Sequence, residues 1–357
     1  MIYNNVELFN VAEIERSEVY GGAVLQRFPR AVRETLGRPG FESGRVKSCS
    51  STGCEIRFVT DGPSAAVTLS AIEADACVTV YNGDYFHSVH RLAMGVPTRL
   101  PLDRPSGFSL VGGGMLAKRR FSPDVWRIFI ERGKEPMQIY SVALHQIDTF
   151  GHQLRPPHAD ETPRTRWLAY GSSITHGTGA LNHHNAYIHQ AAGRLGVDVL
   201  NKGIGGACFC EPQIADFFAG QEWDIATLEI GVNMRELFTE AEFEERARYL
   251  TGRLLAAKPG RPVALITIYP NAADFALDTE AKPVVRNRSF REILRKIRRD
   301  TGSPDLHLIE GDTILTQPDA LTVDLIHPSD YGHSMMGQNL ADKLRPILTQ
   351  YGLEVRK

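Results

Sequence analysis

At positions 167–177 the chain reads Trp167-Leu168-Ala169-Tyr170-Gly171-Ser172-Ser173-Ile174-Thr175-His176-Gly177. An apolar run stops at a glycine and two serines, and a segment of helical character follows. This order is typical of a buried strand, a tight turn and a helix. In an open α/β sheet, ligands bind beyond the carboxyl ends of the strands, so a serine in this turn is a candidate nucleophile.

The same turn also has a purely structural interpretation. One of the serines could simply cap the following helix, because serine is a preferred N-cap residue. The nucleophile-elbow motif Gly-x-Ser-x-Gly does not fit, since Thr175 stands where that motif has its second glycine. Residues elsewhere in the chain must therefore decide between a catalytic and a structural serine.

From Arg166 onward, short apolar runs alternate with longer helical segments, which indicates βαβ units and a parallel sheet. Right-handed crossovers between such strands produce a three-layer α/β/α sandwich. The expected strands are 167–170, 197–200, 225–230, 263–268 and 306–309, and the expected helices include 186–195, 243–256 and 285–299.

The first 150 residues have a different pattern, in which apolar and polar residues alternate as they do in half-buried antiparallel strands. Turn signals rich in glycine, proline and asparagine separate these runs at roughly 8–12-residue spacing. Such spacing favours an all-β sandwich of jelly-roll-like type. The expected strands include 55–59, 66–70, 77–81 and 126–130, with one short helix at 31–36.

A change of composition marks the boundary between these two parts. Residues 151–165 contain three prolines and scattered charges without periodicity, as a linker does. The predicted organisation is a β-sandwich domain over residues 1–150, a linker over 151–165 and an α/β domain over 166–357. A chain of 357 residues is long enough for two domains with sizeable cores.

Composition and charge are those of an ordinary globular protein. A formal net charge of −2 provides no basic field for nucleic acid, so no nucleic-acid partner is expected. No stretch approaches the ~20 apolar residues that span a bilayer, and residues 1–7 lack the pattern of a leader. We therefore expect a cytoplasmic protein without a membrane partner. Whether the protein forms a homo-oligomer stays open.

The candidate metal ligands do not form a recognisable site. An odd number of cysteines, without paired CxxC motifs or a histidine pair close to them, points to reduced, structural thiols. His176 and the pair His183-His184 would need a third ligand at suitable spacing, and none is evident. We expect these histidines to face substrate or solvent, and we expect no metal or cofactor. The cysteines are Cys49, Cys54, Cys77, Cys208 and Cys210.

Polar residues also follow other strands of the predicted parallel sheet. The segment 201–206, Asn-Lys-Gly-Ile-Gly-Gly, follows the second strand, and its glycines let backbone N–H groups approach a ligand closely. Asn233 follows the third strand and brings a side-chain amide to the same edge. After the fifth strand, Asp324 stands three residues before His327. A turn at that spacing lets the carboxylate accept from Nδ1 of the imidazole, while Nε2 faces the nucleophile.

These four segments, 171–175, 201–206, 231–233 and 324–328, occur in the order and spacing of the SGNH (GDSL-like) hydrolase superfamily. The resemblance covers about 190 residues, from Arg166 to residue 357. It implies a flavodoxin-like SGNH domain with a parallel sheet. A β-sandwich ahead of such a domain also resembles certain carbohydrate acetylesterases and a GDSL-type acyltransferase of polyketide tailoring.

The resemblance implies a role for each matching residue. Ser173 would be the nucleophile, His327 the base and Asp324 the acid that orients the base. The N–H groups of Gly206 and Ser173 and the side-chain amide of Asn233 would form an oxyanion hole. One missing oxyanion donor typically costs ~2.7–4 kcal/mol of barrier, so three converging donors matter more than perfect tuning of the base.

Two positions depart from the family pattern. Ser172 stands where an aspartate usually precedes the nucleophile, and Met234 stands where an aspartate often follows the amide residue. Other nucleophiles stay open on the residues alone: Ser172, and the thiols of Cys208 and Cys210. A catalytic thiol would leave the serine turn without a role, and buried cysteine commonly behaves as a small hydrophobe.

The resulting hypothesis is a serine esterase that hydrolyses a small acyl ester, such as an acetyl ester, of a sugar-like or other hydroxylated compound. Its partner would be a small-molecule or carbohydrate ester. Transfer of the acyl group to an alcohol stays open, because the first half-reaction is the same. A non-catalytic glycan-binding protein is a third alternative, and the presence of all three triad residues argues against it.

Overall fold

The computed structural model describes residues 1–19, 21–117, 120–133 and 139–355. Packing divides the chain into two compact units. The first comprises residues 1–33 and 46–164, and the second comprises residues 34–45 and the chain from 165 onward. The second unit is therefore built from two separate stretches of sequence, which the sequence pattern did not indicate.

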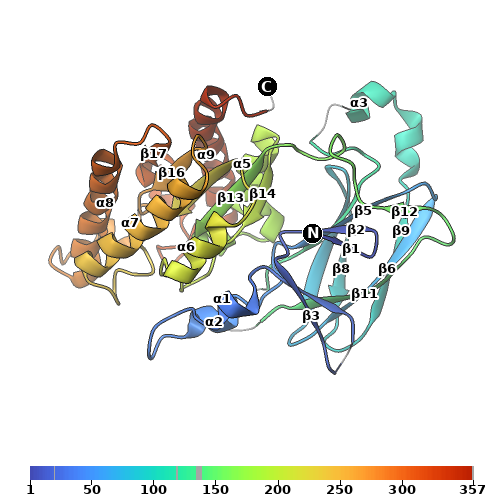
Figure 1. Ribbon diagram of the computed structural model, residues 1–357, viewed down its shortest axis with the longest axis horizontal. Coiled ribbons are helices and arrows are strands. Elements are labelled where there is room, and N and C mark those ends of the chain that lie inside the picture. The colour runs from blue at the N-terminus through green and yellow to red at the C-terminus, as the bar shows by residue number, and fades with distance from the viewer. Residues whose placement is uncertain (20, 118–119, 134–138, 356–357) are drawn as a thin grey trace. The chain divides into compact units, whose positions relative to one another are not determined.

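The first unit contains two antiparallel sheets (Figure 1). One sheet contains β1 (Ile2–Tyr3), β2 (Val6–Phe9), β5 (Glu55–Thr60), β7 (Ala76–Asn82), β8 (Tyr85–Leu92), β10 (Trp126–Ile130) and β12 (Leu154–Arg155). Its order is β1-β2-β5-β10-β7-β8, and β12 also pairs with β5. The other contains β3 (Glu13–Arg16), β4 (Ala23–Gln26), β6 (Ser64–Ala71), β9 (Thr98–Asp103) and β11 (Val142–Asp148), in the order β3-β4-β11-β6-β9.

The predicted strands of this unit are present. β5, β6, β7 and β10 lie within two residues of their expected bounds, and apolar side chains from both sheets form one core. The expected helix at 31–36 is shorter, because α1 (Arg30–Arg33) ends at Arg33. Another short helix is α3 (Gly113–Ala117), and α2 (Ser43–Lys47) lies where the chain passes from the second unit back into the first, at residues 45 and 46. The all-β class is confirmed, and a jelly-roll connection of the strands stays a prediction.

The polar residues of β5 and β10 are buried, although their alternating pattern predicted half-buried strands. Glu55 accepts hydrogen bonds from Arg57 at 2.8 Å and from Arg127 at 2.8 and 2.9 Å. The guanidinium groups of both arginines lie over the ring of Phe121, at 4.9 and 3.9 Å from its centroid. Charge pairing and aromatic cover thus replace water around these side chains.

The stretch 151–165, expected to be a linker, groups with the first unit up to Arg164. β12 lies within it and pairs antiparallel with Val59 and Thr60 of β5. Arg155 also donates to both carboxylate oxygens of Glu161, at 2.7 and 2.8 Å. A two-residue strand is too short to produce a detectable periodicity, so the sequence pattern does not reveal this pairing.

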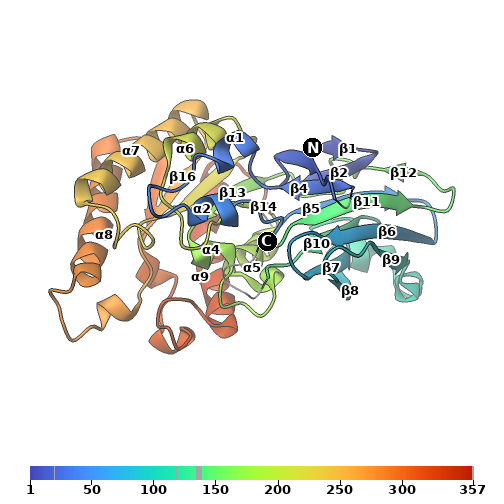
Figure 2. The same cartoon turned by 90° about the horizontal axis from the view of Figure 1, so that it is seen from below.

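The second unit is a three-layer α/β/α sandwich around a five-stranded parallel sheet (Figures 1 and 2). The order of the strands is β14-β13-β15-β16-β17, so the direction in which the chain winds changes between β13 and β15. Ligands bind at such a switch point in open α/β sheets. The predicted fold class is confirmed. The strands are β13 (Arg166–Gly171), β14 (Asp198–Asn201), β15 (Ile225–Glu229), β16 (Val263–Ile266) and β17 (Leu306–Ile309).

Helices cover both faces of this sheet (Figure 1). α5 (Tyr187–Leu195) and α9 (Asp330–Gln350) pack together on one face. α6 (Pro212–Ala219), α7 (Glu240–Ala257) and α8 (Lys282–Thr301) form the layer on the other. α5, α7 and α8 match the expected helices to within three residues. In the described part of the chain, no helix is both long and apolar enough to cross a membrane.

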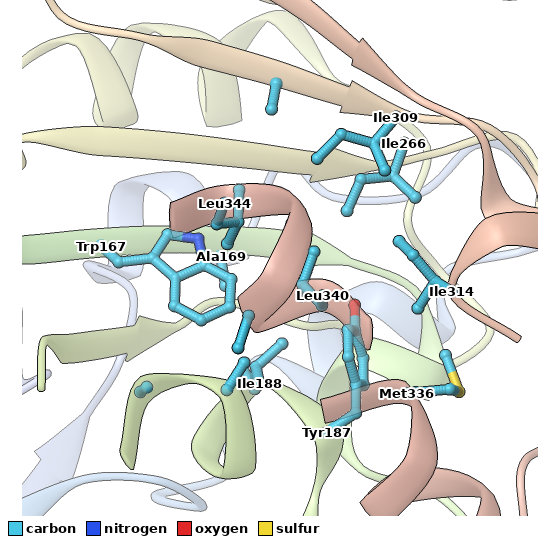
Figure 3. Close-up of a cluster of buried hydrophobic side chains, with 14 of the residues drawn as sticks. Trp167, Ala169, Tyr187, Ile188, Ile266, Ile309, Ile314, Met336, Leu340 and Leu344 are labelled. Atoms are coloured by element: carbon cyan, nitrogen blue, oxygen red, sulfur yellow. The ribbon is translucent and has the colours of Figure 1, made fainter. Parts of the chain in front are cut away.

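Figure 3 shows the apolar core between the sheet and the layer of α5 and α9. Trp167 and Ala169 of β13 and Ile266 of β16 meet Ile188 of α5 and Leu340 of α9, and all five side chains are fully buried. Because β13 is anchored in this core, the serine turn that follows it begins from a rigid strand end.

A short segment of the N-terminal half, residues 34–45, completes the second unit. The N–H of Gly37 donates to Oε1 of Glu211 at 2.9 Å. Arg38 donates to the carbonyl of Leu237 at 2.6 Å, and its guanidinium lies 4.8 Å from the ring centroid of Phe238. These contacts hold the segment, which we call the N-terminal insertion, against the loops that precede α6 and α7.

Candidate active site

The predicted nucleophile, base and acid meet in one hydrogen-bonded line. Oγ of Ser173 lies 2.8 Å from Nε2 of His327, and Nδ1 of His327 lies 2.7 Å from Oδ2 of Asp324. A carboxylate only accepts hydrogen bonds, so Nδ1 carries the proton of the neutral imidazole. Nε2 is then free to accept the proton of the serine hydroxyl. The fold thus joins a serine and a histidine that are 154 positions apart.

Local structure explains why Ser173 rather than Ser172 presents its hydroxyl. Ser172 is the buried N-cap of α4 (Ser173–His176), and its Oγ accepts from the N–H of Ile174 at 3.1 Å. Ser173 is the first residue of α4 and is partly exposed. Gly177 ends this one-turn helix with a φ of +99°, a conformation that glycine adopts without strain. The structural role that one serine could play therefore belongs to Ser172.

Asp324 is held by its own loop. Its Oδ1 accepts from the N–H groups of Ile326 and His327, both at 2.9 Å, and from the hydroxyl of Thr322 at 2.8 Å. Partial burial raises the pKa of the Asp324 carboxyl, but the hydrogen bonds from His327, Ile326 and Thr322 outweigh it and hold this pKa well below its usual range. The carboxylate beside the imidazole is therefore ionised at neutral pH.

The predicted oxyanion donors follow β14 and β15. Asn233 is half-buried, and its Oδ1 accepts from the N–H of Cys208 at 3.2 Å. Because its amide oxygen is engaged there, the Nδ2 group is the end of this side chain that is available to a ligand. Gly206 is exposed and has a φ of +68°. A Cβ on neighbouring Gly205 would lie 3.4 Å from Cβ of Ser173, so this loop passes beside the serine.

A buried glutamate beneath the serine turn was not singled out by the sequence analysis. Glu229 is the last residue of β15 and is 1% exposed. Burial raises the pKa of its carboxyl to about 7, although hydrogen bonds from Ser172 and Thr175 lower it. A signal does exist in the sequence, because a glutamate between Leu228 and Ile230 interrupts an apolar strand, where a charged group needs partners.

Burial counts against the two cysteines that follow Gly206 as nucleophiles. Cys208 and Cys210 are both buried. Burial holds the pKa of the Cys208 thiol well above its usual value, whereas a cysteine attacks as the thiolate. None of the five cysteines, all of which lie in the described ranges, forms a disulfide.

The histidines after the serine turn form a small cluster. The ring centroid of His183 lies 5.8 Å from that of His176 and 4.9 Å from that of His189. His183 is buried, contrary to expectation, because its turn folds back toward Asn201, whose Nδ2 is 3.3 Å from Nε2 of His183. His176 and His184 stay partly exposed. Among the residues that the structure describes, no group of three or more His, Cys, Asp or Glu could hold a metal ion.

Solved structures share this fold over nearly the whole chain. The salicylyl-acyltransferase SsfX3 from a tetracycline biosynthetic pathway has a TM-score of 0.75 and 16% identity, and the match covers 99% of this chain and 97% of that one. A family two carbohydrate esterase from Clostridium thermocellum, in complex with cellohexaose, has a TM-score of 0.63 and 11% identity, with 96% and 99% covered. A family two carbohydrate esterase from Cellvibrio japonicus has a TM-score of 0.63 and 13% identity, with 97% and 96% covered.

At identities of 11–16%, the solved structures show only that the fold is shared. The family is established by comparison of the sequence with family models. A comparison with curated protein sequences found no match. The model of the GDSL-like lipase/acylhydrolase family matches residues 165–349, more than half of the chain and nearly all of the α/β sandwich. The chain therefore belongs to the GDSL-like lipase/acylhydrolase family of ester-hydrolysing enzymes, as its resemblance to the SGNH hydrolases predicted.

Proposed function

We propose that this enzyme is a serine esterase that removes a small acyl group, such as acetyl, from a sugar-like or other hydroxylated compound. The observation that carries the proposal is the aligned triad, with 2.8 Å between Oγ of Ser173 and Nε2 of His327 and 2.7 Å between Nδ1 of His327 and Oδ2 of Asp324. The fold shared with carbohydrate esterases supports the substrate class.

Acylation uses the three residues in turn. Nε2 of His327 takes the hydroxyl proton of Ser173 while Oγ attacks the ester carbonyl carbon, and a tetrahedral intermediate forms. The imidazolium then gives this proton to the alkoxy oxygen as the bond between the acyl carbon and that oxygen breaks. The alcohol leaves, and the acyl group remains on Ser173. Asp324 stays ionised throughout and stabilises the imidazolium, because it keeps the hydrogen bond from Nδ1.

The negative charge of the intermediate needs donors on the other side of the carbonyl. The Nδ2 group of Asn233 and the N–H groups of Gly206 and Ser173 take this role in our proposal. The bond from Cys208 N–H to Oδ1 of Asn233 supports it, because it keeps the amide turned so that Nδ2 is available. Preorganised donors of this kind typically lower the barrier by ~2.7–4 kcal/mol each.

Water completes the cycle in the esterase. It occupies the place that the alcohol left, and Nε2 of His327 removes a proton from it as its oxygen attacks the acyl carbon of the intermediate on Ser173. Collapse of the second tetrahedral intermediate breaks the ester bond to Ser173 while the imidazolium returns its proton to Oγ, and the acid is released. The chemistry of both halves needs only these residues and the oxyanion donors.

Acyl transfer is the second candidate, and the fold shared with a salicylyl-acyltransferase over 99% of the chain favours it. An alcohol would then replace water in the second half-reaction, with the same histidine as base. The donor in both candidates is a small-molecule or carbohydrate ester. A turnover assay with an aryl acetate, in water alone and with added sugar alcohols, separates the two, because mass spectrometry distinguishes free acetate from an acetylated acceptor.

The test of the nucleophile is covalent labelling. A fluorophosphonate probe should add its mass to the peptide that contains residues 171–175 in wild-type protein and in Ser172→Ala, but not in Ser173→Ala. Absence of aryl acetate turnover together with absence of labelling would support the non-catalytic glycan-binding alternative. An adduct on Ser172, Cys208 or Cys210 would overturn the assignment of Ser173.

A further inference from the structure

One carboxylate oxygen accepts hydrogen bonds from residues on both sides of Ser173. Oε2 of Glu229 accepts from the N–H of Ser172 at 2.8 Å, from Oγ of Ser172 at 2.7 Å and from Oγ1 of Thr175 at 3.0 Å. Ser172 precedes Ser173 and Thr175 follows it by two positions. The turn that carries the candidate nucleophile is therefore tied at both ends to a single acceptor on the neighbouring strand.

Sheet register and a missing side chain bring this acceptor so close. β13 and β15 pair in parallel with Gly171 opposite Glu229. A Cβ on Gly171 would lie 2.6 Å from Oε2 of Glu229 and 2.2 Å from Oγ1 of Thr175, which no real Cβ could do. Glycine at this position leaves room for the carboxylate to reach the backbone of the turn.

The hydrogen bonds have a defined direction. Thr175 has one hydroxyl proton, and because it donates that proton to Glu229, it accepts from the hydroxyl of Tyr187 at 2.8 Å. Ser172 likewise donates to Glu229 while its Oγ accepts from the N–H of Ile174. In the described part of the chain, no arginine or lysine forms an ion pair with Glu229, so neutral donors alone hold this side chain.

We propose that Glu229 is a positioning residue, whose Oε2 fixes the turn so that Oγ of Ser173 stays within hydrogen-bond reach of Nε2 of His327. The proposal rests on the proposed function. It also gives a reason for the departure at position 172. An aspartate there would face the carboxylate of Glu229 across a hydrogen-bond distance, and two buried carboxylates without a cation repel each other. Serine avoids this repulsion and donates instead.

The first test separates the acceptor from mere packing. Glu229→Ala removes the acceptor and should lower kcat on an aryl acetate about 100-fold, with KM within about threefold, since a small displacement of a reacting group can cost that much. Glu229→Gln keeps an acceptor oxygen and should stay within about tenfold of wild type. The matched control is Thr227→Val. Thr227 lies two positions before Glu229 on β15, and its Oγ1 accepts a buried hydrogen bond from Nε1 of Trp167. Loss of this bond should keep kcat within about twofold of wild type.

The second test uses rescue and does not depend on the alanine variant folding. Ser172→Asp should lose kcat by about 100-fold or more, because two carboxylates then share one buried site. Adding Glu229→Gln to Ser172→Asp should restore kcat at least tenfold, since one charge is removed and the acceptor is kept. All rates are divided by the fraction of folded protein, taken from the cooperative unfolding transition of each variant, so loss of folded protein does not enter.

The outcomes distinguish this inference from the proposed function. Wild-type protein that neither turns over an aryl acetate nor reacts with the probe would contradict the esterase itself. An active wild type would overturn the role of Glu229 if Glu229→Ala kept kcat within threefold of Thr227→Val. The role of Glu229 would also be overturned if kcat fell as far in Glu229→Gln as in Glu229→Ala. A third such outcome is a kcat of the Ser172→Asp/Glu229→Gln double variant no higher than that of Ser172→Asp.

Discussion

Glu55 in the first unit and Glu229 in the second are both buried strand glutamates, with 4% and 1% of their surface exposed. Burial by itself favours the protonated form of both carboxyl groups and so acts to raise the pKa of each. Around Glu55 the charges of Arg127 and Arg57 outweigh burial and hold the pKa well below its usual range. Around Glu229, hydroxyl and N–H donors of Ser172 and Thr175 oppose burial, and the pKa is raised to about 7.

The contrast separates two uses of a buried carboxylate. A buried ion cluster contributes little net stability, but the loss of one partner leaves a buried charge uncompensated. The cluster of Glu55 with Arg57 and Arg127 therefore makes the first unit sensitive to substitution. A buried carboxylate without a cation lowers the stability of the folded state at neutral pH. Such a cost is expected at a functional site, where Glu229 holds the serine turn in position. We expect substitutions in the first unit to change stability and those around the triad to change rate.

The largest effect should come from Asp324→Asn, which keeps the shape of the side chain but removes its charge. We expect kcat to fall about 10⁴-fold, or ~5.4 kcal/mol of barrier, because the imidazole loses the acceptor that sets its tautomer. The Asp324 side chain is 48% exposed, so the free energy of unfolding should change little. Steady-state kinetics and urea unfolding measure the two quantities. An unchanged kcat would remove Asp324 from the triad.

The next effect should be on stability alone. Arg127→Met removes one of the two cations around Glu55, and we expect the free energy of unfolding of the first unit to fall by about 3–5 kcal/mol. The kcat per labelled active site should stay within about twofold of wild type. Adding Glu55→Gln should not recover the lost stability, because the buried Arg57 then loses the carboxylate at 2.8 Å and keeps only that of Glu7, at 3.7 Å. A fall in kcat without a change in unfolding would break the contrast between the two units.

The smallest effect concerns pH. The pKa of Glu229 is about 7 in the folded protein and 4.5 for an unperturbed glutamate, as in the unfolded chain, so between these values the folded state keeps a proton that the unfolded state has lost. Stability from this group therefore falls as pH rises from 4.5 to 7, by up to about 3 kcal/mol, and the whole penalty is present above pH 7. Glu229→Gln should remove this penalty. The unfolding free energy of the variant should therefore rise relative to that of wild type as the pH increases from 4.5 to 7.

Glu55 provides the opposite sign for the same measurement. Its pKa is depressed in the folded protein, so the stability that its ionisation contributes is fully present above pH 4.5 and is lost as pH falls below that value. Unfolding free energies at pH 5, 6, 7 and 8 should therefore show a constant difference between Glu55→Gln and wild type. A constant difference for Glu229→Gln as well would mean that Glu229 is ionised throughout this range.

The sequence predicted what local patterns encode. The strands of the parallel sheet are short apolar runs, and the four polar segments that follow them have a family spacing, so Ser173, His327 and Asp324 could be named together. Periodicity could not reveal the surroundings of the buried glutamates. An alternating strand has the same pattern whether its polar face meets water or an ion cluster, and the pairing of Gly171 with Glu229 depends on the order of strands in the sheet.

The N-terminal insertion sets an order of events in the synthesis of the chain. Gly37 leaves the ribosome 174 residues before Glu211, its hydrogen-bond partner. At about 5–20 residues per second, this segment waits roughly 9–35 s before its contacts in the second unit exist. Closing so long a loop also adds a slow step to folding. A single recombination point between residues 45 and 165 would separate the insertion from its partners in the second unit. The catalytic unit can therefore be exchanged intact only if both stretches of sequence move together.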